Sequence, residues 1–228
     1  MEIKGSVALV TGANRGIGRE FARALLARGA DKVYAGVRDP ASVRDKNLSP
    51  LRLDVTDPEE VVAAAVAAGD VTIVINNAGV GGFSTKLWEG SLDGARQAME
   101  VNYFGTWAVS RAFAPVLARN GGGALVNMLS TASWASRPDY PGYAASKAAQ
   151  WSLTGALREG MRAQGTLVIG VHASFVETEL SSFTDAPKIG AADVAEQTME
   201  ALENDRVEVL TDERTRQVKS ALSQPLDH

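Results

Sequence analysis

The stretch SVALVTGANRGIGREFARALLARG, residues 6–29, decides the fold of this chain. It begins with the apolar run at residues 6–10, which is typical of a strand buried on both faces of a parallel sheet. Residues 19–28 follow helical spacing and end at Gly29, where a helix commonly stops. The turn TGANRGIG, residues 11–18, connects the two. A strand, a glycine-rich turn and a helix in this order predict the start of a βαβ unit.

The glycines of this turn are Gly12, Gly16 and Gly18. A pyrophosphate needs a close backbone approach and free N–H groups at a helix N-terminus, and side chains at these positions would block it. The spacing Gly-x-x-x-Gly-x-Gly differs from the commonest dinucleotide fingerprint, Gly-x-Gly-x-x-Gly. Taken alone, the turn could equally be a tight strand–helix connection without a ligand.

The alternation of strands and helices continues along the rest of the chain. Further strands are predicted at residues 32–37, 51–53, 71–75, 124–128, 167–172 and 207–210. Helices are predicted at residues 61–68, 91–119, 141–164, 191–202 and 212–222. This pattern indicates an α/β fold, a single-domain Rossmann-like doubly wound parallel sheet of about seven strands with helices on both faces, spanning residues 1–228. Ligands of such a sheet gather outside the carboxyl ends of its strands.

Composition excludes several classes of function. Hydrophobic residues make up 45% and charged residues 22% of the 228 residues, as in ordinary globular proteins. A net charge of −4 gives no basic field for nucleic acid. The absence of cysteine excludes thiol chemistry, and two histidines are too few for a histidine-based metal site, so no metal is expected. Without a signal peptide or an apolar stretch that could span a bilayer, we expect a cytoplasmic protein that does not bind membranes.

A second informative stretch is YAASK, residues 143–147. On a helix, Tyr143 and Lys147 share one face. An ammonium beside a phenol lowers the pKa of the phenol, because the positive charge favours the phenolate. Such a phenol can give and take a proton near neutral pH. The pair alone also occurs on solvated helices, so the interpretation requires a cofactor and a second hydrogen-bond donor elsewhere in the chain.

Five motifs in order resemble the short-chain dehydrogenase/reductase family. They are TGANRGIG, NNAG at residues 76–79, Asn102 within EVNYFG, Ser130, and YAASK. The resemblance extends from residue 6 to about residue 210 and covers nearly the whole chain. It implies an oxidoreductase that moves a hydride between a nicotinamide cofactor and a carbonyl or alcohol.

The resemblance also implies which residues bind the cofactor. The glycine turn would hold the phosphates, residues 54–55 would meet the adenine, and residues 76–79 would border the adenosine ribose and brace the fourth strand. Thr178 would hydrogen-bond the carboxamide. The implied cofactor-binding set is Gly12, Asn14, Arg15, Gly16, Ile17, Gly18, Arg38, Asp54, Val55, Asn76, Asn77, Ala78, Gly79, Tyr143, Lys147, Val176 and Thr178.

Four residues are implied to be catalytic. Ser130 lies 13 residues before Tyr143, the spacing that the family uses between its serine and tyrosine. By the resemblance, Tyr143 is the general acid in reduction and the base in oxidation, and Ser130 hydrogen-bonds the carbonyl oxygen. Lys147 would bind the ribose hydroxyls and lower the pKa of Tyr143. Asn102 would hold a water that relays protons towards Lys147, although it could instead be an ordinary polar residue on a helix face.

The end of the second strand predicts NADP(H) in preference to NAD(H). An acidic residue there binds the ribose 2′-hydroxyl of NAD, and a basic one accommodates the 2′-phosphate of NADP. Val37 stands where the acidic residue would lie, and Arg38 follows it. A guanidinium suits phosphate through paired donors, and Arg15 could add a second one. The neighbouring Asp39 is expected to cap the next helix and point away.

The segment after the sixth strand departs from the family pattern. Ala173 and Ser174 stand where relatives carry Pro-Gly, while Thr178 is kept. Because the backbone there passes close to the nicotinamide in relatives, the departure leaves its local geometry open. His172 is expected to be a packed residue at the strand end rather than a catalyst, since the catalytic set is complete without it.

Aromatic residues in loops after the strands suggest an open, largely apolar site for a hydrophobic ketone or aldehyde. The candidates are Phe83, Trp88, Trp134, Tyr140, Phe175 and Phe183. Each of them could instead belong to the core or to a subunit contact. Relatives pack the helices that correspond to residues 95–117 and 144–157 against a second subunit, so a homodimer or homotetramer is expected; otherwise the apolar stripes of these helices face only the sheet.

The function favoured by the sequence is an NADPH-dependent carbonyl reductase. Two alternatives stay open at this point. One is an NADP-binding regulatory protein without turnover, whose sequence signature, the loss of Tyr143 or Lys147, does not occur here. The other is an alcohol dehydrogenase that works in the oxidative direction with the same site.

Overall fold

The computed structural model describes residues 1–81 and 86–224. Within these residues, one parallel sheet has the strand order β3-β2-β1-β4-β5-β6-β7. Its strands are β1 (Val7–Thr11), β2 (Lys32–Val37), β3 (Ser49–Arg52), β4 (Ile73–Asn76), β5 (Ala124–Met128), β6 (Leu167–His172) and β7 (Glu208–Leu210). The winding reverses between β1 and β4, which places the expected ligand crevice at the carboxyl ends of these two strands. The predicted doubly wound parallel sheet is confirmed.

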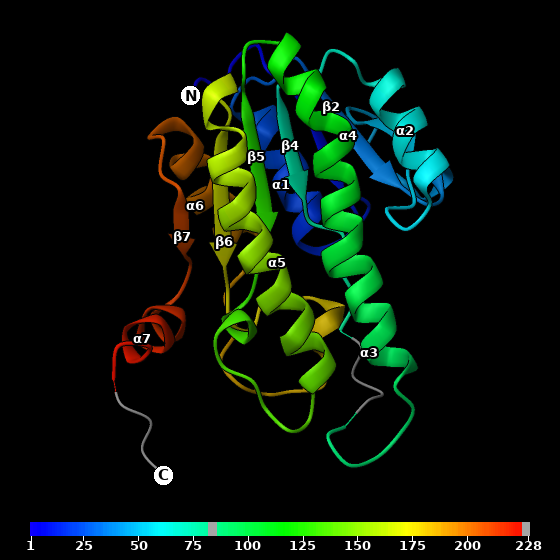
Figure 1. Cartoon of the computed structure of the whole chain (residues 1–228). Coiled ribbons are helices and arrows are strands. Elements are labelled where there is room, and N and C mark those ends of the chain that lie inside the picture. The colour runs from blue at the N-terminus through cyan, green and yellow to red at the C-terminus, as the bar shows by residue number, and fades with distance from the viewer. Residues whose placement is uncertain (82–85, 225–228) are drawn as a thin grey trace.

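Helices cover both faces of the sheet (Figure 1). The helices are α1 (Gly16–Ala27), α2 (Pro58–Ala67), α3 (Asp93–Ala98), α4 (Thr106–Arg119), α5 (Pro141–Gly160), α6 (Ala191–Glu203) and α7 (Glu213–Ala221). Short helical turns are η1 (Pro40–Ser42), η3 (Thr131–Ser133), η4 (Arg162–Gln164) and η5 (Glu179–Ser181). Helices α4 and α5 lie in front of the sheet in Figure 1, and α1 and α6 lie behind it.

Two apolar clusters fill the space between the sheet and these helices. One joins α1 and α6 to the sheet and contains Phe21 and Met199. The other lies under α2 and α4 and contains Val61 and Phe113. Strand β5 is buried along its whole length, which is why its residues read as a continuous apolar run broken only by Asn127.

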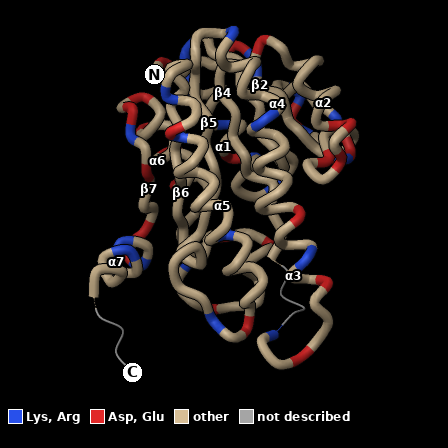
Figure 2. Tube along the Cα trace, viewed as in Figure 1, with Lys and Arg blue, Asp and Glu red and all other residues tan. Residues whose placement is uncertain are grey.

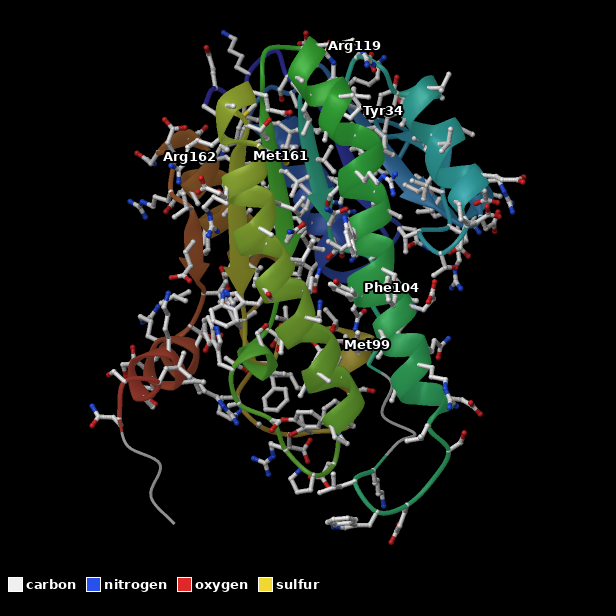
Figure 3. All side chains as sticks on the ribbon, in the orientation of Figure 1. Tyr34, Met99, Phe104, Arg119, Met161 and Arg162 are labelled. Atoms are coloured by element: carbon white, nitrogen blue, oxygen red, sulfur yellow. The ribbon has the colours of Figure 1, made fainter. Side chains whose placement is uncertain are left out.

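The predicted long helix at residues 91–119 is interrupted in its middle. Between α3 and α4 the chain forms the π-helical segment η2 (Met99–Gly105), which contains Asn102. Figure 3 shows Met99 and Phe104 on these turns. A β-carbon at Gly105 would lie 2.7 Å from Cγ2 of Val55, so the segment passes unusually close to the loop after β3. Apolar periodicity does not separate a π-turn from the α-helix around it, so the sequence did not predict this interruption.

Charges of both signs are interspersed along the tube of Figure 2. None of the helices formed by residues 1–81 and 86–224 is long and apolar enough to cross a membrane.

Candidate active site

The turn between β1 and α1 is built by backbone geometry that favours glycine. Gly12 has a φ of 68°, in the left-handed region. A β-carbon at Gly18 would lie 2.3 Å from the carbonyl oxygen of Gly12, so no larger residue fits there. Helix α1 starts after Arg15 without a side-chain cap. Its first N–H groups are therefore available to an anion, which fits the pyrophosphate of a dinucleotide.

The NNAG segment fastens β4 to this turn. The Oγ1 of Thr11 accepts hydrogen bonds from the N–H groups of Asn77 (3.0 Å) and Ala78 (2.9 Å). The Asn77 side chain donates to the carbonyl of Thr11 at 2.9 Å. The Nδ2 of Asn76 donates to Asn127 (2.9 Å) and Ser110 (3.1 Å), which ties β4 to β5 and α4. The bracing predicted for this segment is present in these hydrogen bonds.

At the end of β2, Arg38 is exposed. The carboxylate of Asp39 turns away to accept the Ala41 N–H at 3.0 Å and caps η1, as the sequence predicted. The Nδ2 of Asn14 donates to Ser42 at 3.1 Å, joining η1 to the glycine turn.

Asp54 lies after β3, close to Arg38. Burial raises the pKa of Asp54, but hydrogen bonds from Thr56 and the charges of Arg38 and Arg52 outweigh it and hold the pKa below its usual value. The Asp54 carboxylate is therefore ionised near neutral pH. Val55 is buried and packs against η2 at Gly105.

The segment after β6 that contains η5 contacts the glycine turn. The Arg15 guanidinium forms an ion pair with the carboxylate of Glu179 in η5. In this structure the exposed Arg15 guanidinium faces Glu179, and its contribution to binding a 2′-phosphate stays a prediction. Thr178 lies beside Gly16, with Cγ2 3.4 Å from an ideal β-carbon built there. Its hydroxyl donates to the carbonyl of Val176 at 3.3 Å.

Ser130 and Tyr143 meet at the carboxyl end of β5. Ser130 caps η3, and its Oγ accepts the Ala132 N–H at 3.1 Å. Tyr143 lies in the first turn of α5, which begins at Pro141. The Ser130 hydroxyl is hydrogen-bonded to the Tyr143 phenol. The 13-residue separation therefore brings the two side chains together.

The surroundings of the Tyr143 phenol act on its pKa in opposite directions, and a lowering by Lys147 stays a prediction. Burial raises the pKa of Tyr143, and the hydrogen bond from Ser130 opposes this rise without reversing it. The Lys147 ammonium lies 6.0 Å from the centroid of the Tyr143 ring. Helical spacing indicates a shared face, but it does not reveal that Lys147 is buried there while Tyr143 stays partly exposed.

Lys147 is only 4% exposed. Its Nζ donates to the carbonyl of Met128 and to Oε1 of Gln150, both at 2.8 Å. Burial lowers the pKa of Lys147 to about 7. The lysine therefore titrates near physiological pH, and within residues 1–81 and 86–224 these two hydrogen bonds support its charged form.

The Asn102 side chain joins three segments. Its Nδ2 donates to the Val80 carbonyl and to Ser146 Oγ, and its Oδ1 accepts the Val80 N–H, all at 2.9 Å. Because Asn102 is fully buried and makes these bonds, it is not an ordinary polar residue on a helix face. Both of its side-chain N–H groups are used by protein atoms.

The predicted aromatic residues lie in different surroundings. Tyr140 packs edge-on against Tyr143 at 6.3 Å, and Phe175 packs edge-on against Phe183 at 6.1 Å. Trp88 is 88% exposed. Trp134 stacks on His172 with ring centroids 3.9 Å apart, so its ring is held by core contacts, the alternative that the sequence left open. Phe83 lies outside the described residues.

His172 is buried at the end of β6, as the sequence predicted. Burial lowers its pKa to about 4, so the imidazole is neutral near pH 7. Its Nδ1 lies 3.3 Å from the carbonyl oxygen of Ser130.

The replacement of Pro-Gly by Ala173 and Ser174 is accommodated by hydrogen bonds. The Ala173 carbonyl accepts the N–H of Thr131 at 3.0 Å, and the Ser174 N–H donates to the Asp212 carboxylate at 3.0 Å. Ser174 does not have a positive φ, so glycine is not required at this position.

Sequence reasoning missed Gln150, which contacts Lys147 directly. Gln150 follows the lysine by three residues, which places both on the same helix face. This spacing could have predicted the contact. The sequence did not show that this face is buried. Within the described ranges there is no group of three or more His, Cys, Asp or Glu side chains placed to hold a metal ion.

Comparison with known proteins identifies the family. Residues 6–188 match the family of short chain dehydrogenases. The chain is 34% identical over 227 residues to 1-deoxy-11-beta-hydroxypentalenate dehydrogenase of Streptomyces exfoliatus, covering 90% of this chain and 82% of that protein. A short chain dehydrogenase from Burkholderia cenocepacia J2315 in complex with NADP is 38% identical, with a TM-score of 0.94 over 98% of this chain and 95% of that chain. A relative from Burkholderia phymatum in complex with NAD is 28% identical, with a TM-score of 0.85 over 100% of both chains. The sheet order, the glycine turn and these similarities together show that the chain belongs to the short-chain dehydrogenase/reductase family of NAD(P)-dependent oxidoreductases.

Proposed function

We propose that the protein is an NADPH-dependent carbonyl reductase, which reduces hydrophobic ketones or aldehydes to alcohols within a single cofactor-binding and catalytic domain. The observation that carries this proposal is the hydrogen-bonded pair of Ser130 and Tyr143 at the carboxyl end of β5, with the buried ammonium of Lys147 one turn further along α5. Two hydroxyl groups at this edge of the sheet can serve one carbonyl oxygen.

The nicotinamide supplies the hydride when it is bound. Tyr143 donates the proton that the carbonyl oxygen needs, and Ser130 hydrogen-bonds the same oxygen as negative charge develops there. The raised pKa of Tyr143 keeps the phenol protonated at neutral pH, and this supports the reductive direction. Lys147 has one ammonium N–H beyond the two that bind Met128 and Gln150, and this donor is assigned to the ribose hydroxyls.

Asn102 is assigned a supporting role in this scheme. In the proton relay inferred from the family resemblance, a water would have to donate to an oxygen of Asn102, because protein atoms occupy both side-chain N–H groups. The side chain itself joins η2 to α5 through Ser146, one residue before Lys147.

A screen of NADPH consumption across ketones and aldehydes tests the proposed reaction, with Tyr143→Phe as the control. The variant is expected to bind NADPH and to lose turnover, because it keeps the ring and loses the proton. Retention of a large part of kcat by Tyr143→Phe would contradict the acid role. Tight NADPH binding without turnover on any carbonyl would favour an NADP-binding regulatory protein instead.

A second candidate is oxidation of a secondary alcohol by the same residues. The similarity to the pentalenate dehydrogenase of Streptomyces exfoliatus favours it. The two candidates differ in direction, so NADP⁺ reduction with cyclic secondary alcohols, measured beside NADPH consumption, separates them.

The preference for NADP(H) is proposed from Arg38. Its guanidinium is exposed beside the ionised Asp54, and Asp39 points away into the cap of η1. The Burkholderia cenocepacia relative was solved with NADP and the Burkholderia phymatum relative with NAD, so family membership alone leaves the choice open.

Replacing Arg38 tests this preference. Arg38→Ala is expected to raise the KM for NADPH about tenfold or more and to leave the KM for NADH nearly unchanged, because only NADPH carries the 2′-phosphate. Arg162→Ala is the matched control, since this exposed guanidinium in η4 pairs with Glu159 at 2.6 Å, and η4 precedes β6, towards the opposite edge of the sheet. Equal losses with both cofactors would contradict the assignment.

We also propose that the protein forms a homodimer or a larger homo-oligomer through α4 and α5. These helices lie side by side on one face of the sheet (Figure 1). Three large aromatic residues on and beside them, Phe104, Trp107 and Trp151, are exposed. Exposed aromatic residues are a frequent feature of subunit contacts.

A further inference from the structure

Gln150 is a fully buried amide inside helix α5, with 0% exposure. Burying an unpaired amide is costly, so its hydrogen bonds indicate why it is there. Its Oε1 accepts from Lys147 Nζ at 2.8 Å, and its Nε2 donates to Thr106 Oγ1 at 2.9 Å. The amide is therefore fixed at both ends, by α5 on one side and α4 on the other.

Further buried hydrogen bonds hold the helix backbone around Gln150 and Thr106. The carbonyl of Thr106 accepts from Ser110 at 2.7 Å, and Ser110 accepts from Asn76 at 3.1 Å. On the other side, the Gln150 carbonyl accepts from Thr154 at 2.8 Å, and Thr154 accepts from Asn127 at 2.9 Å. All of these side chains are buried. The bonds of Ser110 and Thr154 hold the backbone carbonyls of Thr106 and Gln150, and the side-chain amide of Gln150 is itself oriented by its bonds to Lys147 and Thr106.

We propose that Gln150 is a positioning residue for the reaction, whose anchored amide oxygen fixes the Lys147 ammonium and keeps it charged. The effect of Gln150 on catalysis rests on the proposed function. The contact between Gln150 and Lys147 does not, because it lies entirely within the protein.

The physical reason is the scarcity of acceptors around this ammonium. Among the described residues, the Met128 carbonyl and the Gln150 amide oxygen accept its hydrogen bonds. A hydrogen bond from a charged donor is stronger than one from a neutral donor, so removing one acceptor favours the neutral amine. Burial already lowers the pKa of Lys147 to about 7, so a further fall would neutralise it at physiological pH.

Few other titratable groups face Lys147. Tyr143 lies on the same helix, with its ring centroid 6.0 Å away. His172 on β6 is buried, and the Lys147 charge contributes to its lowered pKa. Burial is the cause that lowers the pKa of Lys147 itself, with no carboxylate compensating it. The amide of Gln150 thus stands where an acidic partner would otherwise be needed.

Two substitutions of Gln150 test this with opposite expected signs. Gln150→Met keeps the volume and removes the acceptor, so the pKa of Lys147 is expected to fall by about one unit or more. Gln150→Glu supplies a carboxylate at the same place, so the pKa is expected to rise by at least as much. NMR titration of ¹⁵N-labelled lysine side chains measures this pKa in the cofactor-free protein, with Lys147→Met assigning the signal.

Thr154→Val is the matched control. It removes a buried hydroxyl of the same network, one turn further along α5, that does not touch Lys147. It is expected to lower the unfolding midpoint about as much as Gln150→Met and to leave the Lys147 pKa unchanged. A purely structural role for Gln150 predicts that these two variants behave alike in the titration, and that result would overturn the proposal. If Gln150→Met does not fold, the absence of an upward shift in Gln150→Glu overturns it instead.

The kinetic readout is kept separate from the titration. The alkaline limb of kcat/KM for NADPH is expected to move to lower pH in Gln150→Met and to higher pH in Gln150→Glu, by the same shifts that NMR reports. The Lys147 pKa could shift in opposite directions in Gln150→Met and Gln150→Glu while the wild type reduces no carbonyl compound. That result would support the role of Gln150 in positioning Lys147 and would contradict only the proposed function. Shifted kinetic limbs with an unchanged Lys147 pKa would overturn the positioning role.

Discussion

Burial governs the ionisation of both titratable groups at the centre of the site. It raises the pKa of the Tyr143 phenol and lowers that of the Lys147 ammonium, so each group shifts towards its neutral form. A neutral phenol is the form that can donate a proton to a carbonyl. The hydrogen bond from Ser130 opposes the effect of burial on the pKa of Tyr143. The two acceptors bonded to Lys147 favour its charged form in the same way, so the neighbours of each group adjust its pKa.

Ser130→Ala is expected to slow the reaction through two effects. It removes the hydrogen bond to the developing negative charge, at a cost of about 2–4 kcal/mol in the barrier, or roughly 30- to 1000-fold in kcat. It also removes the bond that holds down the pKa of Tyr143, so the pH profile of the oxidative direction should shift to higher pH. Steady-state kinetics in both directions measure these effects.

Ser133→Ala is the control for that experiment. This serine lies in the same turn η3, and its buried Oγ has no hydrogen-bond partner among the described residues. Its replacement should leave kcat within about twofold of the wild type, since it removes no interaction with Tyr143. An unchanged kcat in Ser130→Ala would take Ser130 out of the mechanism.

Lys147→Met is expected to stabilise the fold in a pH-dependent way. The pKa of Lys147 lies at about 7 in the folded protein, against 10.5 ordinarily. The unfolded chain therefore binds more protons than the folded protein between these two pH values. The buried lysine lowers the free energy of unfolding most below pH 7, and this destabilisation disappears as the pH rises towards 10.5. The gain from Lys147→Met should be about 2 kcal/mol at acidic pH, after the loss of two hydrogen bonds, and should shrink through this window.

Denaturant unfolding at several pH values between about 6 and 10 measures this gain. Lys86→Met is the control, because this lysine is exposed and its replacement should change stability by a similar small amount at each pH. A gain from Lys147→Met that grows with pH would contradict the lowered pKa.

At the scale of the elements, the buried strands were the most predictable part of the fold. The boundaries predicted for β2, β5 and β6 coincide with those of the structure, because a strand covered on both faces must be apolar from end to end. The third strand was displaced, predicted at residues 51–53 and found at Ser49–Arg52, because this edge strand is only partly buried and its pattern is weaker.

The candidate site was predictable where backbone geometry dictates the residue type. The glycine turn and the pairing of Ser130 with Tyr143 follow from motifs and spacing. The ion pair of Arg15 with Glu179 and the stacking of Trp134 on His172 join segments that are distant in the chain. Such contacts depend on side-chain directions in the folded protein, which local sequence patterns do not specify.

The contact between α3 and α5 yields a further prediction. A β-carbon at Gly142 would lie 2.5 Å from Cβ of Ala95, so Gly142→Ala must push α3 away from the first turn of α5. We expect a loss of about 1–3 kcal/mol in stability and a fall in kcat, because Tyr143 is the next residue. Thermal unfolding and steady-state kinetics measure the two effects.

Gly160→Ala provides the comparison on the same helix. No atom lies within 4 Å of a β-carbon built at Gly160, and alanine favours a helix more than glycine does. Its unfolding midpoint should equal or slightly exceed that of the wild type. If Gly142→Ala matched it, the close packing of α3 on α5 would not matter for stability.

On the scale of the whole molecule, the two faces of the sheet are covered differently. Helices α1 and α6 pack against each other and bury one apolar cluster. On the opposite face, α4 and α5 flank η2 and leave aromatic side chains on their outer surface, with Trp107 45% exposed. Tyr143 and Lys147, the proposed active-site residues, lie on one of these two helices, so a subunit contact there would also stiffen the helix that carries them.

The proposed assembly predicts the mass of the protein in solution. The chain has a mass of 24.0 kDa, so the wild type should scatter light as a particle of at least about twice this mass. Trp107→Glu places a charge in the centre of the proposed contact and should shift the mass towards that of a single chain, because an unpaired carboxylate is costly to bury. Trp88→Glu, which replaces a more exposed tryptophan outside both helices, should leave the mass unchanged. A wild type that scatters as a single chain would remove the subunit contact, and the exposed aromatic residues of α4 and α5 would then be surface residues of a monomer.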